Sequence, residues 1–459
     1  MDRLDAGFRS GRIARFPALI LRLYSLLVWL AIPLLRAKLR RRALAEPGYA
    51  VAVPERFGHY SQPPGQGFVW VHAVSLGETR AAAILLLALR REMPGMRLLL
   101  THGTATGRAE GRALLQPGDV QIWQPWDSRG AVQRFVRHFQ PCIGILMETE
   151  IWPNLLATCQ RANIPVVLAN ARLSAKSLRQ AQRLSALSRP AYGALAAVWA
   201  QTAADAQRLA EAGASSPTVL GNLKFDATPD AGQLALGRAW RRAGRPVVLL
   251  ASAREGEELL LLQCLESFKP LAHIPPVQAA TQLGVKDVQW LIVPRHPQRF
   301  DAVAAQVTAQ GLSLSRRSQW ARECGDKPDP ADVWLGDSLG EMALYYGLAD
   351  LALLGGSFAP VGGQNLIEAA ACGCPVVMGP STFNFAEAAE LAIAAGAACR
   401  VTNMPAAVAQ ALVWLNNPET LACAAAAGPQ FAGAHQGAAV KTALAILTLL
   451  GKDASPKSH

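Results

Sequence analysis

The chain lacks the patterns that identify metal sites and disulfide frameworks. Its eight cysteines stand singly except for Cys372 and Cys374, and the sequence contains no CxxC pair, no DxD pair, no HExxH and no cluster of histidines. Closely spaced cysteines, histidines or carboxylates are the usual ligands of structural and catalytic metals. We therefore expect neither a metal nor any other cofactor, and the unpaired thiols favour a reducing compartment.

Acidic residues are few relative to basic ones, but the excess is concentrated at one end. The formal net charge is +12, and residues 1–42 contribute +8 of it through ten Arg or Lys residues against Asp2 and Asp5. The rest is nearly neutral and carries no stripe of basic and aromatic residues, so we expect no nucleic-acid partner. A dehydrogenase is also disfavoured, because no GxGxxG follows the first predicted strand.

The basic N-terminal segment contains an apolar run long enough to cross a bilayer. Residues 16–35 are interrupted only by Arg22 and two prolines, and no small-residue cleavage site follows them, which argues against a secretory signal. We predict that residues 1–42 anchor the chain to phospholipid at the cytoplasmic face of the inner membrane, because most of the basic cluster lies on the side of the catalytic bulk. A spanning helix and an interfacial helix both fit this pattern, and a buried core helix is the alternative.

Short apolar runs alternate with helical segments along the rest of the chain. The runs are rich in Val, Ile and Leu without alternation, which is typical of parallel sheets covered on both faces. The pattern is interrupted near residues 222–245 and then begins again. We predict an α/β chain with two doubly wound domains facing a cleft. The N-terminal domain spans 43–225, a linker spans 226–245, and the C-terminal domain spans 246–459, with a last helix near 435–451 that fits either domain. The candidate strands lie at 68–74, 96–101, 119–123, 142–147, 165–169, 196–200, 246–251, 289–293, 332–335, 350–354, 375–378 and 398–401.

Polar side chains follow several strands of the first predicted sheet. Glu78 comes after the first strand, Glu148 and Glu150 follow the fourth, and Arg172 follows the fifth. Carboxylates gathered at one sheet edge are candidates for acid/base catalysis. Each of them also fits a simpler interpretation, since a glutamate in the first turn of a helix is favoured by the helix dipole. Glu150 fits that interpretation well because "EIWPN" is predicted to open a helix.

The second predicted sheet carries the features of a nucleotide site. Two glycine pairs in "GGSFAPVGGQN" precede a helix that begins near Asn365, and such turns let the backbone approach phosphate. Glu368, in that first turn, is placed to accept hydrogen bonds from ribose hydroxyls. Arg295 follows another strand, and arginine matches phosphate oxygens. Other residues expected at the same edge are His296, Gly340, Glu341, Ser252 and Glu255.

Nine stretches in this order resemble one family, the 3-deoxy-D-manno-octulosonic acid (Kdo) transferases. They are "ERFG", "VHAVSLGE", "METEIWPN", "NARLS", "GNLKFD", "VPRHP", "LGE", "GGSFAPVGGQN" and "GPSTFNFAE". The resemblance implies a GT-B fold of two Rossmann-like domains, with the acceptor in the first and the donor CMP-Kdo in the second. It also implies an inverting, metal-independent transfer of Kdo to the lipid A precursor.

The resemblance assigns roles to individual residues. Glu78 matches the general base, and Glu148 and Lys224 match residues that stabilise the transition state. The matched nucleotide contacts are Pro294, Arg295, His296, Leu339, Gly340, Glu341, Asn365, Leu366, Ile367 and Glu368. Supporting positions are Ser252, Gly362, Gly363, Gln364 and Arg172.

The chain departs from the family pattern in its donor half. Gln364 stands where the family commonly has histidine, Ala369 where proline often follows the glutamate, and Arg254 where histidine is usual. Glutamine donates a neutral hydrogen bond but carries no charge, and Arg254 is a candidate to compensate. Two rival interpretations stay open at this point. One is another GT-B enzyme that reads a uridine diphosphate, such as a nucleotide-sugar epimerase, and the other is a membrane-tethered nucleotide-binding scaffold.

Overall fold

A computed structural model describes residues 16–241, 244–267, 283–320, 328 and 330–451, and it divides the chain into two compact units. The first contains residues 1–226 and 436–459, and the second contains residues 227–435. The last helix, which was predicted within 246–459 but fitted either domain, is grouped with the first unit. The predicted linker over 226–245 is also not a linker throughout, since helix α9 (Ala231–Arg241) occupies most of it.

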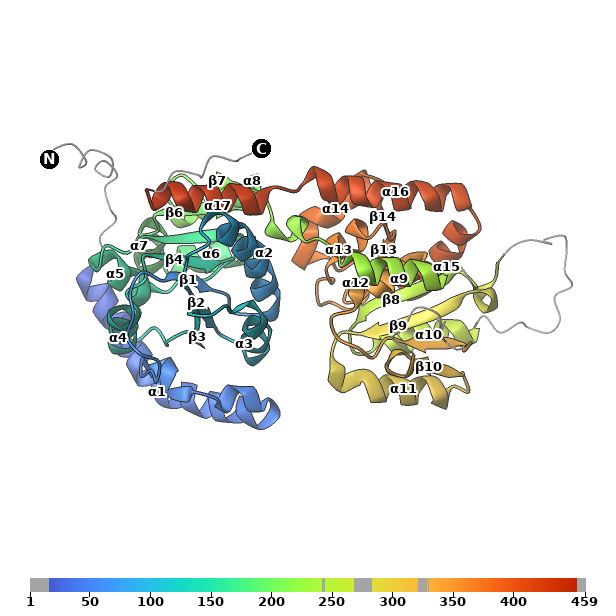
Figure 1. The fold of residues 1–459 in the computed structure, drawn as a ribbon, viewed down its shortest axis with the longest axis horizontal. Helices are drawn as coiled ribbons and strands as arrows, with labels where there is room; N and C mark the ends of the chain where they lie inside the picture. The colour runs from blue at the N-terminus through green and yellow to red at the C-terminus, as the bar shows by residue number, and fades with distance from the viewer. Residues whose placement is uncertain (1–15, 242–243, 268–282, 321–327, 329, 452–459) are drawn as a thin grey trace, which may run out of the picture. The chain divides into compact units, whose positions relative to one another are not determined.

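The first unit is built on a parallel sheet of seven strands in the order β3-β2-β1-β4-β5-β6-β7 (Figure 1). The six strands predicted for this domain are confirmed as β1 to β6, whereas the two-residue β7 was not predicted. The apolar runs are buried along their whole length in β1, β2, β4 and β5, as expected for strands covered on both faces. The bounds are β1 (Val69–His72), β2 (Leu98–His102), β3 (Val120–Trp123), β4 (Ile143–Met147), β5 (Val166–Ala171), β6 (Ala197–Ala200) and β7 (Thr218–Val219).

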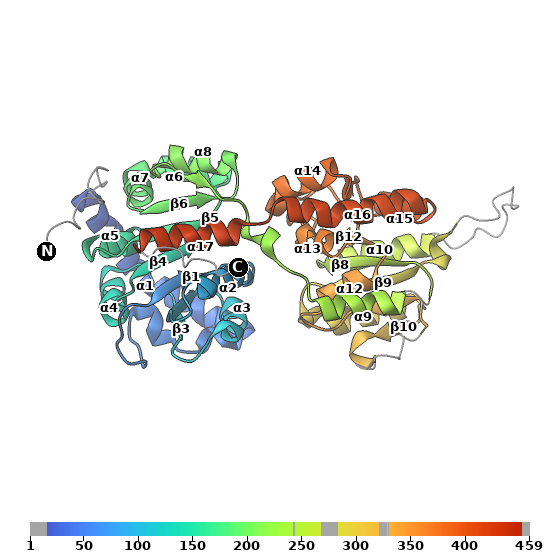
Figure 2. The same cartoon turned by 45° about the horizontal axis from the view of Figure 1, so that its top comes forward.

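Helices cover both faces of this sheet and form two apolar cores. One core includes buried residues of α4 (Arg129–Phe139), α5 (Pro153–Arg161), α6 (Ala175–Arg183), α7 (Ser185–Gly193) and α8 (Ala203–Ala212). The other core lies between the strands, α2 (Leu76–Glu92) and the last helix α17 (Ala438–Leu449), and Figure 2 shows α17 beside α2. A shorter helix, α3 (Ala105–Gly111), also contacts α2.

The last helix returns to the first unit for two local reasons. Its apolar residues Ala443, Ile446 and Leu447 are fully or almost fully buried in the core beside β1 and β4. In addition, the carboxylate of Asp226 accepts hydrogen bonds from the backbone N–H groups of Gly437 and Ala439. Because the free N–H groups of a helix start favour an acceptor with negative charge, Asp226 fixes where α17 begins.

The second unit repeats the design with the strand order β10-β11-β9-β8-β12-β13-β14. Helices α10 (Glu257–Ser267), α11 (Phe300–Ala309) and α15 (Met404–Leu415) bury their apolar residues on one face. Helices α9 and α12 (Met342–Leu348) pack closely at Gly237. Only glycine fits there, since a Cβ at this position would lie 2.2 Å from the Leu344 backbone oxygen. The remaining helices are α13 (Leu366–Ala371), α14 (Ala386–Ala394) and α16 (Pro418–Ala434). The strands are β8 (Val247–Ala253), β9 (Gln289–Pro294), β10 (Leu314–Arg316), β11 (Val333–Leu335), β12 (Leu351–Leu354), β13 (Val376–Met378) and β14 (Ala398–Arg400). Only the three-residue β10 was not predicted.

Helix α1 (Ala18–Ala45) contains the apolar run and packs on the first unit along one side. Within the described residues, it is the one helix long and apolar enough to cross a membrane. Two hydrogen bonds hold its inner side, from the Tyr24 hydroxyl to the Asp127 carboxylate (2.9 Å) and from the Ser25 hydroxyl to the Asn154 side chain (2.8 Å). The opposite side is a stripe of leucines, each more than half exposed, formed by Leu19, Leu23, Leu26, Leu27, Leu30 and Leu34. The buried-core alternative for this segment is therefore wrong.

Candidate functional site

Glu78 and Glu148 lie at the point of the first sheet where the strand order reverses. Strands β1 and β4 are neighbours, and the chain leaves them toward opposite edges of the sheet. Ligands of open parallel sheets bind at such a reversal, beside the carboxyl ends of the strands. Glu78 enters from the first turn of α2, after β1, and Glu148 directly follows β4. The expected convergence of strand-end carboxylates in the first unit is thus confirmed for these two.

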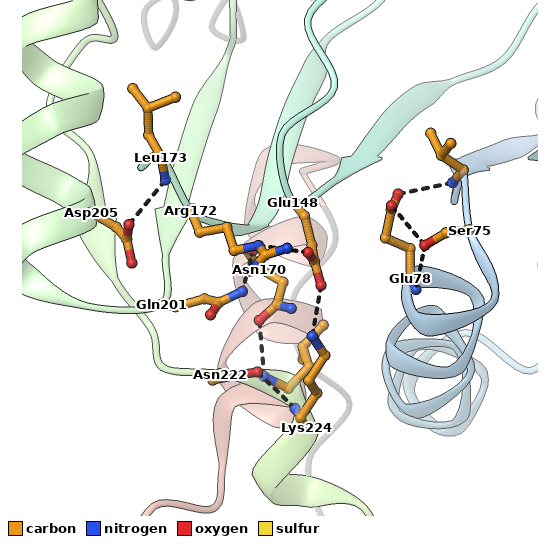
Figure 3. Close-up of polar contacts among 12 residues, drawn as sticks. Ser75, Glu78, Glu148, Asn170, Arg172, Leu173, Gln201, Asp205, Asn222 and Lys224 are labelled. Atoms are coloured by element: carbon orange, nitrogen blue, oxygen red, sulfur yellow. Dashed lines mark hydrogen bonds and ion pairs between the residues drawn. The ribbon is translucent and has the colours of Figure 1, made fainter. Parts of the chain in front are cut away.

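The local sequence "VSLGE" positions the Glu78 carboxylate. Ser75 is the N-cap of α2, and its hydroxyl accepts from the Glu78 N–H (3.4 Å) while donating to Glu78 Oε1 (3.0 Å). Glu78 Oε2 accepts from the backbone N–H of Val74 (2.9 Å), and Figure 3 shows Glu78 beside its cap Ser75. The simpler interpretation is therefore correct in placing Glu78 in the first turn of a helix. The same cap holds the carboxylate in one orientation.

The surroundings of Glu78 change its acidity. Burial raises the pKa of Glu78 to about 7, and the negative charges of Glu148 and Glu150 act in the same direction, whereas the hydrogen bonds from Val74 and Ser75 act against it. A carboxylate with a pKa near neutrality accepts a proton more readily than an ordinary glutamate and is still largely ionised above pH 7. Glu78 is therefore a candidate general base.

Glu148 is buried and faces two cations. Its Oε2 lies 2.8 Å from Arg172 Nε, and its Oε1 lies 3.0 Å from Lys224 Nζ (Figure 3). The backbone of Glu148 is left-handed, with φ of +59°. A non-glycine residue in that region carries strain, which accumulates at functional sites. The arrangement directs the charges of Lys224 and Arg172 toward the same sheet edge as Glu78.

Asn170 joins the ends of β5 and η4 (Leu223–Asp226), the short 3-10 helix that carries Lys224. Its side-chain oxygen accepts from the backbone N–H of Leu223 (3.0 Å), and its own backbone is also left-handed, with φ of +52°. Asn222 Oδ1 then accepts from the Lys224 N–H (3.0 Å). These bonds place Lys224 opposite Glu148, although 76 residues separate the two in the chain.

The prediction for Glu150 is wrong in its structural part. Helix α5 begins at Pro153, so Glu150 lies in the loop before the helix and not in its first turn. Proline at the first helical position explains the late start, since its fixed φ suits that position. Burial raises the pKa of Glu150. From this loop, the negative charge of Glu150 contributes to the raised pKa of Glu78.

In the second unit, the strand order reverses between β8 and β12, and basic side chains follow β8 and β9. Ser252, within β8, has φ of +56° at a break in the pairing with β9. Arg254 Nη1 lies 2.8 Å from His296 Nε2. Because arginine only donates, this nitrogen of His296 accepts the hydrogen bond. Arg295 Nε donates to Gln364 Oε1 (3.2 Å), so the unusual glutamine contacts this arginine.

The glycine-rich loop after β12 is held from within by a residue that the sequence analysis missed. The buried carboxylate of Glu257 accepts from the backbone N–H groups of Arg254, Gly356, Phe358 and Ala359, at 2.7–3.2 Å. Gly362 N–H donates to the Ser381 hydroxyl, and Gly363 N–H to the Gly356 oxygen. These amides already have acceptors, and Arg254 and Arg295 bring positive charge to the same sheet edge. The position of Glu257 at the start of α10 was the signal in the sequence that could have identified it. The sequence analysis selected the nearby Glu255 instead, whose side chain is 84% exposed.

The remaining predicted nucleotide contacts surround the same sheet edge. Glu341 precedes α12 and forms an ion pair with Arg317 (2.8 Å) and a hydrogen bond with Ser338, and neither partner was predicted. Asn365 caps α13 through Ile367 N–H (3.2 Å), as expected, and Glu368 lies in the first turn. Ser252 donates to the sulfur of Met342 at 3.9 Å. Three of the predicted contacts, Pro294, Leu366 and Ile367, are buried. Three others, His296, Leu339 and Gly340, are exposed.

The described residues contain no group of three or more His, Cys, Asp or Glu side chains that could hold a metal ion. The expectation of metal-independent chemistry stays a prediction.

The family model and the sequence relatives indicate the same family. Residues 52–227 match the family model of 3-deoxy-D-manno-octulosonic-acid transferase (kdotransferase). The chain is 46% identical over 429 residues to the 3-deoxy-D-manno-octulosonic acid transferase of Bordetella pertussis, covering 91% of this chain and 97% of the relative. It is 33% identical over 374 residues to the enzyme of the same name from Haemophilus influenzae, covering 79% and 83%.

Solved structures show the fold. The UDP-N-acetylglucosamine 2-epimerase of Neisseria meningitidis, bound to UDP-GlcNAc, matches with a TM-score of 0.52 and 15% identity, covering 83% of this chain and 98% of the epimerase. A putative UDP-N-acetylglucosamine 2-epimerase of Listeria monocytogenes matches with a TM-score of 0.53 and 14% identity, covering 84% and 99%. The GT-B fold expected from the resemblance is confirmed, while identity this low says nothing about activity. The relatives of high identity, and not these structures, show the family. The chain belongs to the family of 3-deoxy-D-manno-octulosonic acid transferases.

Proposed function

We propose that this chain is an inverting, metal-independent glycosyltransferase that moves Kdo from CMP-Kdo to the lipid A precursor, the tetraacyldisaccharide bisphosphate lipid IVA, in lipopolysaccharide core biosynthesis. The observation that carries the proposal is the Glu78 carboxylate, held by Ser75 and Val74 with a pKa raised to about 7 by burial. It lies at the sheet reversal where a ligand is expected. Membership of the family supports the choice of sugar.

The reaction needs one proton acceptor and one means of stabilising the leaving group. Glu78 accepts the proton of the attacking sugar hydroxyl while that oxygen forms a bond to the anomeric carbon of Kdo. The bond from this carbon to the phosphate oxygen breaks, and CMP leaves with the electron pair. Because the attack comes from the face opposite the phosphate, the anomeric configuration is inverted. Lys224 and Arg172, directed by Glu148, stabilise the negative charge that develops.

The second unit is the proposed CMP-Kdo site. Arg295 and Arg254 supply positive charge at the sheet reversal, and each is oriented by a neutral partner, Gln364 and His296 respectively. Arginine binds phosphate through a planar set of N–H donors, so these two side chains suit a single phosphate without a metal. Glu341 and Glu368 are the proposed acceptors for ribose hydroxyls.

One assay tests the activity. The purified full chain, CMP-Kdo and lipid IVA should release CMP and form a product heavier by whole Kdo units in mass spectrometry. The mass also counts the units added to each acceptor. Release of UDP from a UDP-sugar in place of CMP would favour the epimerase-like alternative, and binding of CMP without turnover would favour the scaffold.

The proposed location is the cytoplasmic face of the inner membrane, with α1 lying in the interface. The hydrogen bonds of Tyr24 and Ser25 join the middle of the apolar run to the first unit, so a spanning position would have to break both. The leucine stripe on the outer side gives a continuous apolar surface, which is what an interfacial helix presents to acyl chains.

Substituting two leucines of the stripe should weaken membrane binding. We expect Leu23→Gln with Leu30→Gln to lower the partition coefficient onto phospholipid vesicles about 100-fold, since burying two half-exposed leucines contributes about 3 kcal/mol. Co-sedimentation with vesicles measures the effect. The matched control is Leu87→Gln with Leu184→Gln, a pair of similar exposure elsewhere on the same unit. Equal losses in the two double variants would contradict an assignment of the stripe as the membrane surface.

The bond between Tyr24 and Asp127 should have a pH-dependent effect on stability. Burial raises the pKa of Asp127 to about 7, and Tyr24 is one of three donors to its carboxylate. Tyr24→Phe removes a donor that favours the ionised form, so we expect a loss of about 1–3 kcal/mol in unfolding free energy at pH 8.5 and a smaller loss at pH 5.5. Tyr60→Phe is the control, because the Tyr60 hydroxyl has no hydrogen-bond partner among the described residues. A loss that does not vary with pH would refute the role of Asp127.

A further inference from the structure

A pocket of about 610 Å³ opens beside the C-terminal half of α1, and the proposed reaction does not use it. Its walls come from α1, from the 3-10 helices η1 (Pro47–Ala50) and η2 (Val53–Phe57), and from α4. None of its lining residues is among the proposed catalytic or nucleotide-binding residues. They are Arg36, Leu39, Arg40, Ala43, Tyr49, Ala50, Val53, Pro54, Phe57, His59 and Arg134.

One stripe of α1 forms the wall of this pocket. Arg36, Leu39, Arg40 and Ala43 are spaced by three or four residues, so they lie on one side of the helix. Leu39 is buried in a small apolar cluster with Tyr49 and Trp123 that supports the pocket from below. The alternation along the stripe therefore places arginine side chains at the rim and apolar side chains at the base.

The lining is strongly basic, with three arginines, one histidine and no carboxylate. The Arg134 guanidinium donates to the Phe57 backbone oxygen, and the Arg36 guanidinium lies over the Phe57 ring, 4.5 Å from its centroid. No carboxylate of the described residues forms an ion pair with Arg36, Arg40 or Arg134. The pocket thus offers positive charge without an internal counter-ion, and this charge complements an anion.

The position of the pocket along α1 indicates which anion. The exposed leucine stripe ends at Leu34, and the first arginine of the pocket follows two residues later. When α1 lies in the interface with the stripe among acyl chains, the basic side chains of the same helix lie at the level of the lipid phosphates. The apolar base, formed by Leu39, Ala43 and Val53, suits part of an acyl chain or glycerol backbone.

We propose that this pocket binds one anionic phospholipid of the bilayer, with Arg36, Arg40 and Arg134 around the phosphate and the apolar base around the adjoining hydrocarbon. The bound lipid sets the depth of α1 in the leaflet. The inference builds on the proposed membrane location but uses none of the proposed catalytic or nucleotide-binding residues, so a failure of the lipid assay leaves the proposed transfer activity untouched.

The test uses the full chain and phosphatidylglycerol. Native mass spectrometry of the detergent-solubilised protein should show one bound dioleoyl phosphatidylglycerol and much less phosphatidylcholine. Arg36→Gln with Arg40→Gln should lower the affinity about 25-fold, at about fivefold for each arginine near a phosphate. Lys38→Gln with Arg41→Gln is the matched control, since it removes two exposed charges from the same helix outside the pocket. Its affinity should change by less than about threefold.

A second variant separates the pocket from general charge. Ala43→Trp keeps every charge but fills the base, so it should also abolish the bound lipid while the melting temperature confirms folding. An equal loss in the Lys38/Arg41 control would overturn the proposal in favour of diffuse attraction. Displacement of the lipid by millimolar inorganic phosphate would indicate a free-phosphate site. An increased KM for lipid IVA in phospholipid-free micelles, in the Arg36/Arg40 variant alone, would indicate that the pocket binds the acceptor.

Discussion

Replacing Glu78 by glutamine is expected to lower the rate of Kdo transfer by about 10² to 10⁴-fold, the usual contribution of a general base. Glutamine keeps the size and one acceptor oxygen of the side chain, so the hydrogen bond from Val74 or Ser75 is retained. The amide does not accept the proton of the attacking hydroxyl. Single-turnover assays with CMP-Kdo and lipid IVA measure the loss. Affinity for CMP should be unchanged, because Glu78 belongs to the first unit.

Stability provides the control for this variant. The folded-state pKa of Glu78 is raised to about 7, so the ionised side chain destabilises the fold at any pH above its ordinary pKa. The neutral glutamine lacks this cost. The variant should therefore melt at a higher temperature than the parent at pH 8, and the difference should vanish toward pH 4. Near-normal turnover in a well-folded variant would remove Glu78 from the mechanism.

The pH dependence of the parent follows from the same group. Transfer should increase as pH rises through about 7, where Glu78 loses its proton, and then level off. In the Glu78→Gln variant this limb should be absent. A parent profile whose acid limb lies near pH 4.5 would indicate an ordinary carboxylate.

The sheets were predictable because buried parallel strands are nearly continuous apolar runs. Twelve strands appear in the structure close to the predicted positions, and the two that were missed, β7 and β10, have two and three residues. So few residues carry no usable pattern. The strand-end rule also located Glu78 and Glu148, since it depends only on where an apolar run stops.

The pairing within the candidate site was less predictable. The approach of Lys224 to Glu148 depends on left-handed backbone at Glu148 and Asn170. No local sequence pattern predicts left-handed backbone at residues other than glycine. The place of α17 was left open between the two domains for a related reason. A helix rich in Ala, Ile and Leu suits any apolar face, and the contact with Asp226 that selects the first unit joins residues more than 200 positions apart.

Replacing Glu148 by glutamine should affect both rate and stability. The change leaves Lys224 and Arg172 without their carboxylate partner, so Glu148 no longer holds their charges in one orientation. We expect transfer to fall by about 10² to 10³-fold. Unfolding free energy should fall by about 1–3 kcal/mol, less than for a fully buried pair, because the Arg172 side chain is 38% exposed. Glu110→Gln is the matched control, since it breaks an exposed pair with Arg80 that is worth less than about 1 kcal/mol.

The pH profile distinguishes a role in the site from simple loss of structure. The negative charge of Glu148 is one cause of the raised pKa of Glu78. Without it the pKa of Glu78 falls, so the acid limb of the residual activity should move to lower pH than in the parent. A damaged fold would reduce the rate at every pH and leave the limb in place. In the double variant with Lys224→Met, no unpaired ammonium remains, so stability should partly recover while transfer does not. Recovery of both would show that Glu148 serves the fold alone.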